Sequence, residues 1–236
     1  MATDPVKRIQ VLDVPVDCIE QEQALAQLEG LLADKDRHQL VFLNRRKLFK
    51  ARRDAEFRRC LRDASLILPV SPAVVRAAAF LKRDPLGLSS PFPFVIRLLA
   101  LAERLNKSVY LLGSRKEELE RAERNLRGSF PKLRLVGRHA GFFQKPAQKD
   151  VLLAIRKASP ALLLVGDGLP GRDLWILRNK KELGPGVALW AGECFDLFSG
   201  KNRSGRVAVD GTPGPWRLVP VLGFWLLALF HRLFKR

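Results

Sequence analysis

Three glycines within six positions are the residues whose spacing most clearly suggests chemistry. Gly166, Gly168 and Gly171 follow the apolar run 161–165, and a helical pattern begins at Arg172. A strand, a tight glycine turn and a helix start bring backbone N–H groups to one place, and proteins bind phosphate groups in this way. The spacing matches neither the dinucleotide-binding fingerprint nor the P-loop, because no Lys-Ser/Thr pair follows. The alternative is a plain β–α turn in which glycine only relieves steric crowding.

Few other residues form a pattern typical of catalysis. Cys18, Cys60 and Cys194 are widely spaced and form neither a metal motif nor a disulfide framework, which suits a reducing cytoplasm. Two carboxylates near glycine turns are candidates for a general base, Asp167 and Glu193, although a structural or solvated role is the alternative for each. We expect no metal site and no cofactor.

The charge of the chain points to an anionic partner. The 236 residues carry a formal net charge of +18 and are 47% hydrophobic, which is enough for a large core. Phe occurs 14 times and Tyr once, and the four Trp lie in the C-terminal third, away from the basic clusters. This distribution favours a phosphorylated ligand or an acidic membrane surface over nucleic acid. The N-terminus has no apolar signal region, so we expect a cytoplasmic protein.

Strand and helix patterns alternate along most of the chain. Hydrophobic periodicity predicts strands at 6–16 (a strand or a hairpin), 39–43, 65–69, 108–112, 131–137, 162–165 and 187–190. It predicts helices at 19–32, 45–62, 94–105, 117–126 and 151–158 and from Arg172 onward, and one with Ser71 as N-cap and Pro72 at its first position. This alternation predicts an α/β fold with a mostly parallel sheet covered on both faces. Ligands of such sheets bind beyond the carboxyl ends of the strands.

Two basic segments suggest a surface for anions. Half of the helix predicted at 45–62 is basic, which indicates either a solvated face or contact with lipid head groups or a pyrophosphate. Residues 201–215 are polar and rich in Gly and Pro, and 216–234 is nearly all apolar between basic flanks. The uncharged stretch 218–230 is too short to span a bilayer comfortably, and it suits a helix in the interface of an anionic leaflet. Docking on its own domain or on a dimer partner is the alternative. We therefore predict an α/β domain at 1–200 and a helical appendage at 201–236.

Taken in order, these motifs resemble the WecG/TagA/CpsF family of bacterial glycosyltransferases, from about Leu40 to the C-terminus. The matching parts are Leu43-Asn44, Val109–Gly113, Val136-Gly137, Gly141–Phe143, Ser159-Pro160, Val165–Pro170 with Trp175, Ala191-Gly192, Phe195-Asp196 and Gly200. The order of these pieces is specific, although each piece alone is weak.

The resemblance implies a Rossmann-like domain that transfers an N-acetylhexosamine from a UDP-sugar to a polyprenyl-pyrophosphate-linked sugar in cell-surface polysaccharide synthesis, without an obligatory metal. It implies a C-terminal appendage that meets the membrane, and hence a peripheral protein on the inner face of the cytoplasmic membrane; homo-oligomerisation stays open. Donor-binding positions would be Asn44, Gly113, Gly166, Gly168, Pro170, Arg172, Gly192, Asp196 and Arg203.

The sequence departs from the family pattern at its proposed catalytic base. Where the family has Asp-Gly, this chain has Val70-Ser71. Valine cannot accept a proton, and serine is far less basic than a carboxylate. In addition, Gly171-Arg172-Asp173 replaces Lys-Gln-Glu of the family's glycine loop. Two hypotheses follow: a divergent glycosyltransferase, or a catalytically inactive relative that acts as a membrane-associated binding or scaffold protein. Nucleic-acid binding rests on charge alone and ranks third.

Overall fold

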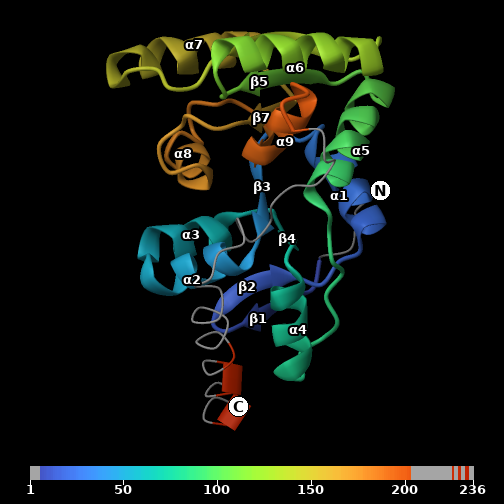
Figure 1. The fold of residues 1–236 in the computed structure, drawn as a ribbon, viewed down its shortest axis with the longest axis vertical. Helices are drawn as coiled ribbons and strands as arrows, with labels where there is room; N and C mark the ends of the chain where they lie inside the picture. The colour runs from blue at the N-terminus through green and yellow to red at the C-terminus, as the bar shows by residue number, and fades with distance from the viewer. Residues whose placement is uncertain (1–5, 203–224, 226–227, 230–231, 234–236) are drawn as a thin grey trace. The chain divides into compact units, whose positions relative to one another are not determined.

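The computed structural model describes residues 6–202, 225, 228–229 and 232–233 (Figure 1). The chain forms two compact units. Unit 1 is built from the described parts of 1–21, 42–89 and 208–236, and unit 2 from 22–41 and the described part of 90–207. The domain division predicted at residue 200 falls beside the undescribed stretch 203–224 and stays a prediction.

Strands and helices alternate as the periodicity predicted. The strands are β1 Arg8–Val11, β2 Val14–Asp17, β3 Arg37–Leu43, β4 Leu66–Pro69, β5 Ser108–Leu112, β6 Arg134–His139, β7 Leu162–Val165 and β8 Gly186–Trp190. The helices are α1 Gln21–Leu31, α2 Arg45–Arg53, α3 Ala55–Asp63, α4 Pro72–Phe80, α5 Pro91–Arg104, α6 Lys116–Ser129, α7 Gln148–Ala158, α8 Asp173–Arg178 and α9 Gly192–Phe198, with the 3-10 turn η1 Lys145–Ala147.

The main sheet has six strands in the order β4-β3-β8-β7-β5-β6. The pairs β3–β8, β8–β7, β7–β5 and β5–β6 are all parallel. In register, Leu162 of β7 lies between Val109 of β5 and Val187 of β8. The predicted α/β fold with a parallel sheet is therefore confirmed. This order brings the carboxyl ends of β5, β7 and β8 to neighbouring positions on one edge.

The strands at the centre of this sheet are buried along their whole length. Every residue of β7 and β8 is buried, as expected for parallel strands covered on both faces. On one face, Leu163 and Ala188 pack in a core cluster with Ile155 of α7 and Trp175 of α8. Burial of this apolar surface fixes where the strands end, and thus where the loops after them begin.

The N-terminal hairpin of unit 1 is the predicted one. β1 and β2 pair antiparallel, with Val11 opposite Val14, and the two turn residues Leu12 and Asp13 have φ of 53° and 64°. Positive φ at both turn positions is the type I′ geometry that matches the twist of a two-residue hairpin. The loosely alternating pattern of 6–16 was thus sufficient to find this element.

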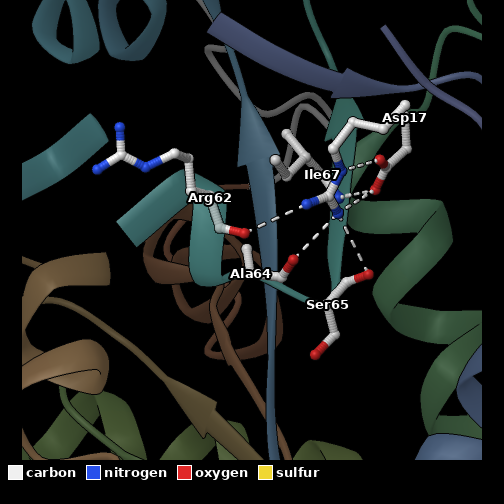
Figure 2. A network of polar contacts seen from close by, with 6 residues as sticks. Asp17, Arg62, Ala64, Ser65 and Ile67 are labelled. Carbon is white, nitrogen blue, oxygen red and sulfur yellow. Dashed lines mark hydrogen bonds and ion pairs between the residues drawn. The ribbon is translucent and has the colours of Figure 1, made fainter. Parts of the chain in front are cut away.

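An ion pair with a buried carboxylate connects the hairpin of unit 1 to β4. The Arg8 guanidinium donates to both carboxylate oxygens of Asp17, at 2.5 and 3.1 Å, and to the carbonyl oxygen of Ala64 at 3.0 Å. Asp17 is fully buried, and it also accepts the backbone N–H of Ile67 at 2.7 Å. Figure 2 shows Asp17, Ala64 and Ser65 around this guanidinium. A buried carboxylate is tolerated because every partner is in place.

One predicted helix is wrong in its extent. The segment 45–62 forms two helices, α2 and α3, because Asp54 between them has an extended backbone (φ −115°, ψ 107°). The Asp54 carboxylate accepts the N–H of Phe57 at 2.9 Å and so caps α3. Basic residues lie on both sides of Asp54, and the pattern they form concealed a residue that competes for backbone hydrogen bonds.

Other helices also differ from the prediction. α5 begins at Pro91 rather than at residue 94, because proline suits the first turn of a helix. α9 occupies a stretch for which no helix was predicted. The predicted start of α4 is confirmed: Ser71 Oγ accepts the N–H of Ala73, and Pro72 is the first helical residue.

Within the described part of the chain, no helix is both long enough and apolar enough to cross a membrane. Most of the apolar C-terminal segment lies outside the described residues. Of those that are described, Trp225 forms a T-shaped pair with Phe80, with ring centroids 5.6 Å apart, and the Arg232 guanidinium lies 4.7 Å from the centre of the Phe80 ring.

We predict that Asp17→Ala lowers the free energy of unfolding by about 3 kcal/mol, because it leaves the Arg8 guanidinium and the Ile67 N–H without their buried acceptor. Urea denaturation would measure this as a lower midpoint at an unchanged slope. As a control, Asp63→Ala removes the exposed carboxylate that faces Arg59 and should change stability by less than about 0.5 kcal/mol. Equal stability of Asp17→Ala and Asp63→Ala would contradict this account of the hairpin.

Candidate functional site

Backbone hydrogen bonds join the loops that follow β5, β6 and β7 in unit 2. The N–H of Gly113 donates to the His139 carbonyl at 2.9 Å, and the N–H of Gly141 donates to the Ser114 carbonyl at 2.8 Å. The N–H of Ser114 donates to the Asp167 carbonyl at 2.7 Å. Three loops distant in sequence thus form one connected surface at the carboxyl edge of the sheet, where ligands of parallel α/β sheets bind.

Glycine is needed where these loops approach most closely. A side chain on Gly113, whose φ is +121°, would place its Cβ 2.6 Å from the Cα of Gly166. A side chain on Gly192, in the first turn of α9, would place its Cβ 2.8 Å from Oδ1 of Asp167. A Cβ on Gly113 would require the backbone to move, whereas one on Gly192 would displace the side chains of Trp190 and Asp167. The predicted glycines Gly113, Gly166 and Gly192 therefore lie where the loops pack closely. Close packing between loops is thus a second reason, besides turn formation, for glycine at these positions.

Two backbone donors of the β7–α8 loop stay available for a ligand. Within the described residues, the N–H groups of Asp167 and Gly168 donate to no protein acceptor, whereas those of Gly113 and Gly166 are used between loops. Gly168 has φ of +93°, and its carbonyl accepts the N–H of Phe142 at 3.0 Å. Consecutive free N–H groups in a turn are a common way to bind an anion. Pro170, which has no N–H, is exposed in the same turn.

The carboxylate of Asp167 lies at the centre of this surface. Burial raises the pKa of Asp167 above its ordinary value, opposed by the positive charges of Arg172 and Lys201 and aided by the negative charges of Asp196 and Glu118. The side chain is partly buried and makes no hydrogen bond or ion pair within the described residues. It is thus a carboxyl group with a raised pKa, in a loop where the N–H groups of Asp167 and Gly168 have no acceptor among the described residues.

Arg172 is the predicted basic residue nearest to this loop. Its guanidinium lies 4.8 Å from the centre of the Trp190 ring, at the end of β8, and the residue is exposed. Its φ of 58° and ψ of −110° are unusual for a residue with a side chain. Stacking on Trp190 directs the charge of Arg172 while leaving it accessible to a ligand.

Lys201 brings a second positive charge to the same surface. Its ammonium lies 2.9 Å from the Glu118 carboxylate and 3.5 Å from that of Asp196. The carboxylate of the predicted residue Asp196 therefore has Lys201 as an ion-pair partner. Within the described residues, no group of three or more His, Cys, Asp or Glu side chains could hold a metal ion.

Glu193 and Cys194 lie in the first turn of α9, the helix that follows β8. Glu193 is partly buried, whereas Cys194 is buried, and burial raises the pKa of its thiol to about 12. A thiol that stays protonated at neutral pH is a poor nucleophile.

Asn44 and the Val70-Ser71 pair belong to unit 1. The side chain of Asn44 accepts the N–H of Lys47 at 2.9 Å and caps α2. At the position of the family's Asp-Gly pair, the Val70 N–H donates to the Leu43 carbonyl at 3.0 Å, and Ser71 is fully buried as the cap of α4. Neither Val70 nor Ser71 presents a base. Arg203 lies outside the described residues.

Three residues of this surface were not predicted from the sequence. Trp190 and Lys201 look like a strand end and a linker residue, and only the fold brings them near Asp167. Ser114, at φ 59°, has a left-handed backbone beside Gly113. A small residue following a strand-ending glycine was the one sequence signal for this position.

Comparison with known proteins identifies the family of this chain. The family model of the glycosyl transferase WecG/TagA/CpsF family matches residues 9–205. A protein of Bacillus spizizenii named N-acetylglucosaminyldiphosphoundecaprenol N-acetyl-beta-D-mannosaminyltransferase is 22% identical over 201 residues, covering 85% of this chain and 76% of that protein. A protein of Staphylococcus aureus with the same name is 23% identical over 199 residues, covering 83% and 77%. This chain belongs to the glycosyl transferase WecG/TagA/CpsF family.

Proposed function

We propose that the protein is a glycosyltransferase that binds a nucleotide diphosphate-sugar at the carboxyl edge of β5, β7 and β8. It transfers an N-acetylhexosamine to a polyprenyl-diphosphate-linked sugar, the kind of acceptor named for its relatives. The observation that carries this proposal is the pair of free N–H groups of Asp167 and Gly168, in a loop packed against two others through glycine. This arrangement suits a diphosphate, which needs several donors at close range.

The basic side chains around the loop support the leaving group. When the bond from the sugar to the diphosphate breaks, negative charge develops on the departing phosphate. The Arg172 guanidinium, oriented by Trp190 at 4.8 Å, would offset that charge. In this proposal, side chains and backbone dipoles offset the charge of the donor.

A second candidate is a relative that binds the donor without turnover. Val70 and Ser71 favour it, because both are buried and neither can accept the proton of the acceptor hydroxyl. One experiment separates the two: calorimetric titration of UDP-N-acetylhexosamines, followed by an assay of UDP release with a lipid-linked acceptor. Binding with release supports the transferase, and binding without release supports the inactive relative. Absence of binding would contradict both.

For Arg172→Ala we predict at least about tenfold weaker donor binding with an unchanged melting temperature, because one charge-assisted hydrogen bond to phosphate is lost. Calorimetry would measure the affinity, and circular dichroism the melting. Arg156→Ala is the matched control, since Arg156 is an exposed basic residue on α7. Equal affinity of the two variants would remove Arg172 from the site.

We also propose that the protein lies on the anionic inner face of the cytoplasmic membrane, through its C-terminal segment. The lipid-linked acceptors in the names of the relatives support this location. So do the net charge of +18 and the basic residues Arg232, Lys235 and Arg236 after the apolar stretch 218–230.

Reversing the charge of these three residues (Arg232→Glu, Lys235→Glu, Arg236→Glu) should release the protein from anionic vesicles. Cosedimentation with phosphatidylglycerol vesicles at about 0.1 M salt would measure it. The control reverses three exposed basic residues of α7, Lys149, Arg156 and Lys157, and so changes the net charge equally. If both variants lose binding to the same extent, net charge rather than the C-terminal segment is responsible.

A further inference from the structure

We propose that Asp167 binds the donor diphosphate in its neutral, protonated form, so that donor binding takes up a proton at this residue. The inference rests on the proposed donor site and adds the protonation state that the site requires. A carboxylic acid has an O–H that can donate to a phosphate oxygen, whereas a carboxylate can only accept.

The geometry of the loop gives the first argument. The free N–H groups that suit the diphosphate belong to Asp167 itself and to Gly168. An anion bound by the backbone N–H of a residue lies within a few ångströms of the carboxyl group of that same residue. The Oδ1 of Asp167 lies on the side of Gly192, 2.8 Å from the place where a Cβ on that glycine would stand. An ionised Asp167 would therefore face the diphosphate as a like charge.

The charged groups around Asp167 give the second argument. Arg172 at the start of α8 and Lys201 after α9 favour the ionised form, while Asp196 of α9 and Glu118 of α6 oppose it. Lys201 is already engaged by Glu118 and Asp196, at 2.9 and 3.5 Å. Burial prevails over these charges, and the pKa of Asp167 is raised even without a ligand. A diphosphate adds negative charge and raises it further.

The sign of the linkage follows from these two pKa values. Below the pKa of the free protein, Asp167 is protonated in both states and affinity does not depend on pH. Between that pKa and the higher pKa of the complex, binding requires uptake of one proton, so affinity falls by up to tenfold per pH unit. Above the pKa of the complex, affinity is again constant, at its lowest value.

The test is calorimetric titration of the whole chain with UDP-N-acetylglucosamine and its epimer UDP-N-acetylmannosamine, from about pH 5 to about pH 8.5. The diphosphate of a nucleotide sugar is esterified at both ends and does not titrate in this range. At each pH, two buffers with different ionisation enthalpies give the number of protons taken up. Asp167→Asn is the main variant, because its amide N–H₂ donates at every pH. EDTA and Mg²⁺ are compared for each protein.

We expect the wild type to take up as much as one proton per donor and to lose affinity as pH rises. Asp167→Asn should take up none and should bind more tightly than the wild type at the upper end of the range. Two controls should behave like the wild type: Glu117→Gln, which removes an exposed carboxylate of α6, and His139→Gln, which removes the imidazole beside the loop.

Three results would overturn the inference. Donor binding by the wild type without proton uptake would reject it while leaving the donor site intact. Loss of proton uptake in His139→Gln would assign the proton to His139. Binding that needs Mg²⁺ in the wild type but not in Asp167→Asn would make Asp167 a metal ligand. If no protein binds either nucleotide sugar at any pH, the proposed function fails together with the inference.

Discussion

The close approach of the loop after β5 to the loop after β7 is the constraint on which the candidate site depends. A Cβ on Gly113 would lie 2.6 Å from the Cα of Gly166, so two backbones occupy a space in which no side chain fits. At this crossing the Ser114 N–H donates to the Asp167 carbonyl, and the Gly166 N–H donates to the Leu112 carbonyl. The next two N–H groups along the chain, those of Asp167 and Gly168, have no acceptor among the described residues, and they are the ones proposed to bind the donor.

The parallel sheet makes this crossing possible. β7 lies between β5 and β8 with every residue buried, so the three strands end at the same level and their loops must share one edge. The apolar core formed with α7 and α8 keeps the strands in register. The chemistry of the edge is thus set by the identity of a few loop residues, while the core sets only where they stand.

The sequence was sufficient to predict the parallel sheet, because short apolar strands that alternate with amphipathic helices permit few other arrangements. It was also sufficient for the glycine loop at 166–171 and for the Ser71-Pro72 helix start. It did not predict the break between α2 and α3 at Asp54, whose carboxylate caps α3 and lies between two groups of basic residues. Nor could it place Trp190 and Lys201 beside Asp167, since those approaches arise from sheet order and not from local spacing.

The aspartate in the glycine loop changes how the missing family base is understood. Val70 and Ser71 remove a carboxylate from one strand end, and Asp167 introduces one at another. These changes are not equivalent, because a group that contacts the diphosphate is beside the leaving group, whereas a base must reach the attacking hydroxyl. Burial raises the pKa of Asp167 above its ordinary value. In the proposed site Asp167 belongs with the donor-binding groups, and its presence alone would not restore the family's base.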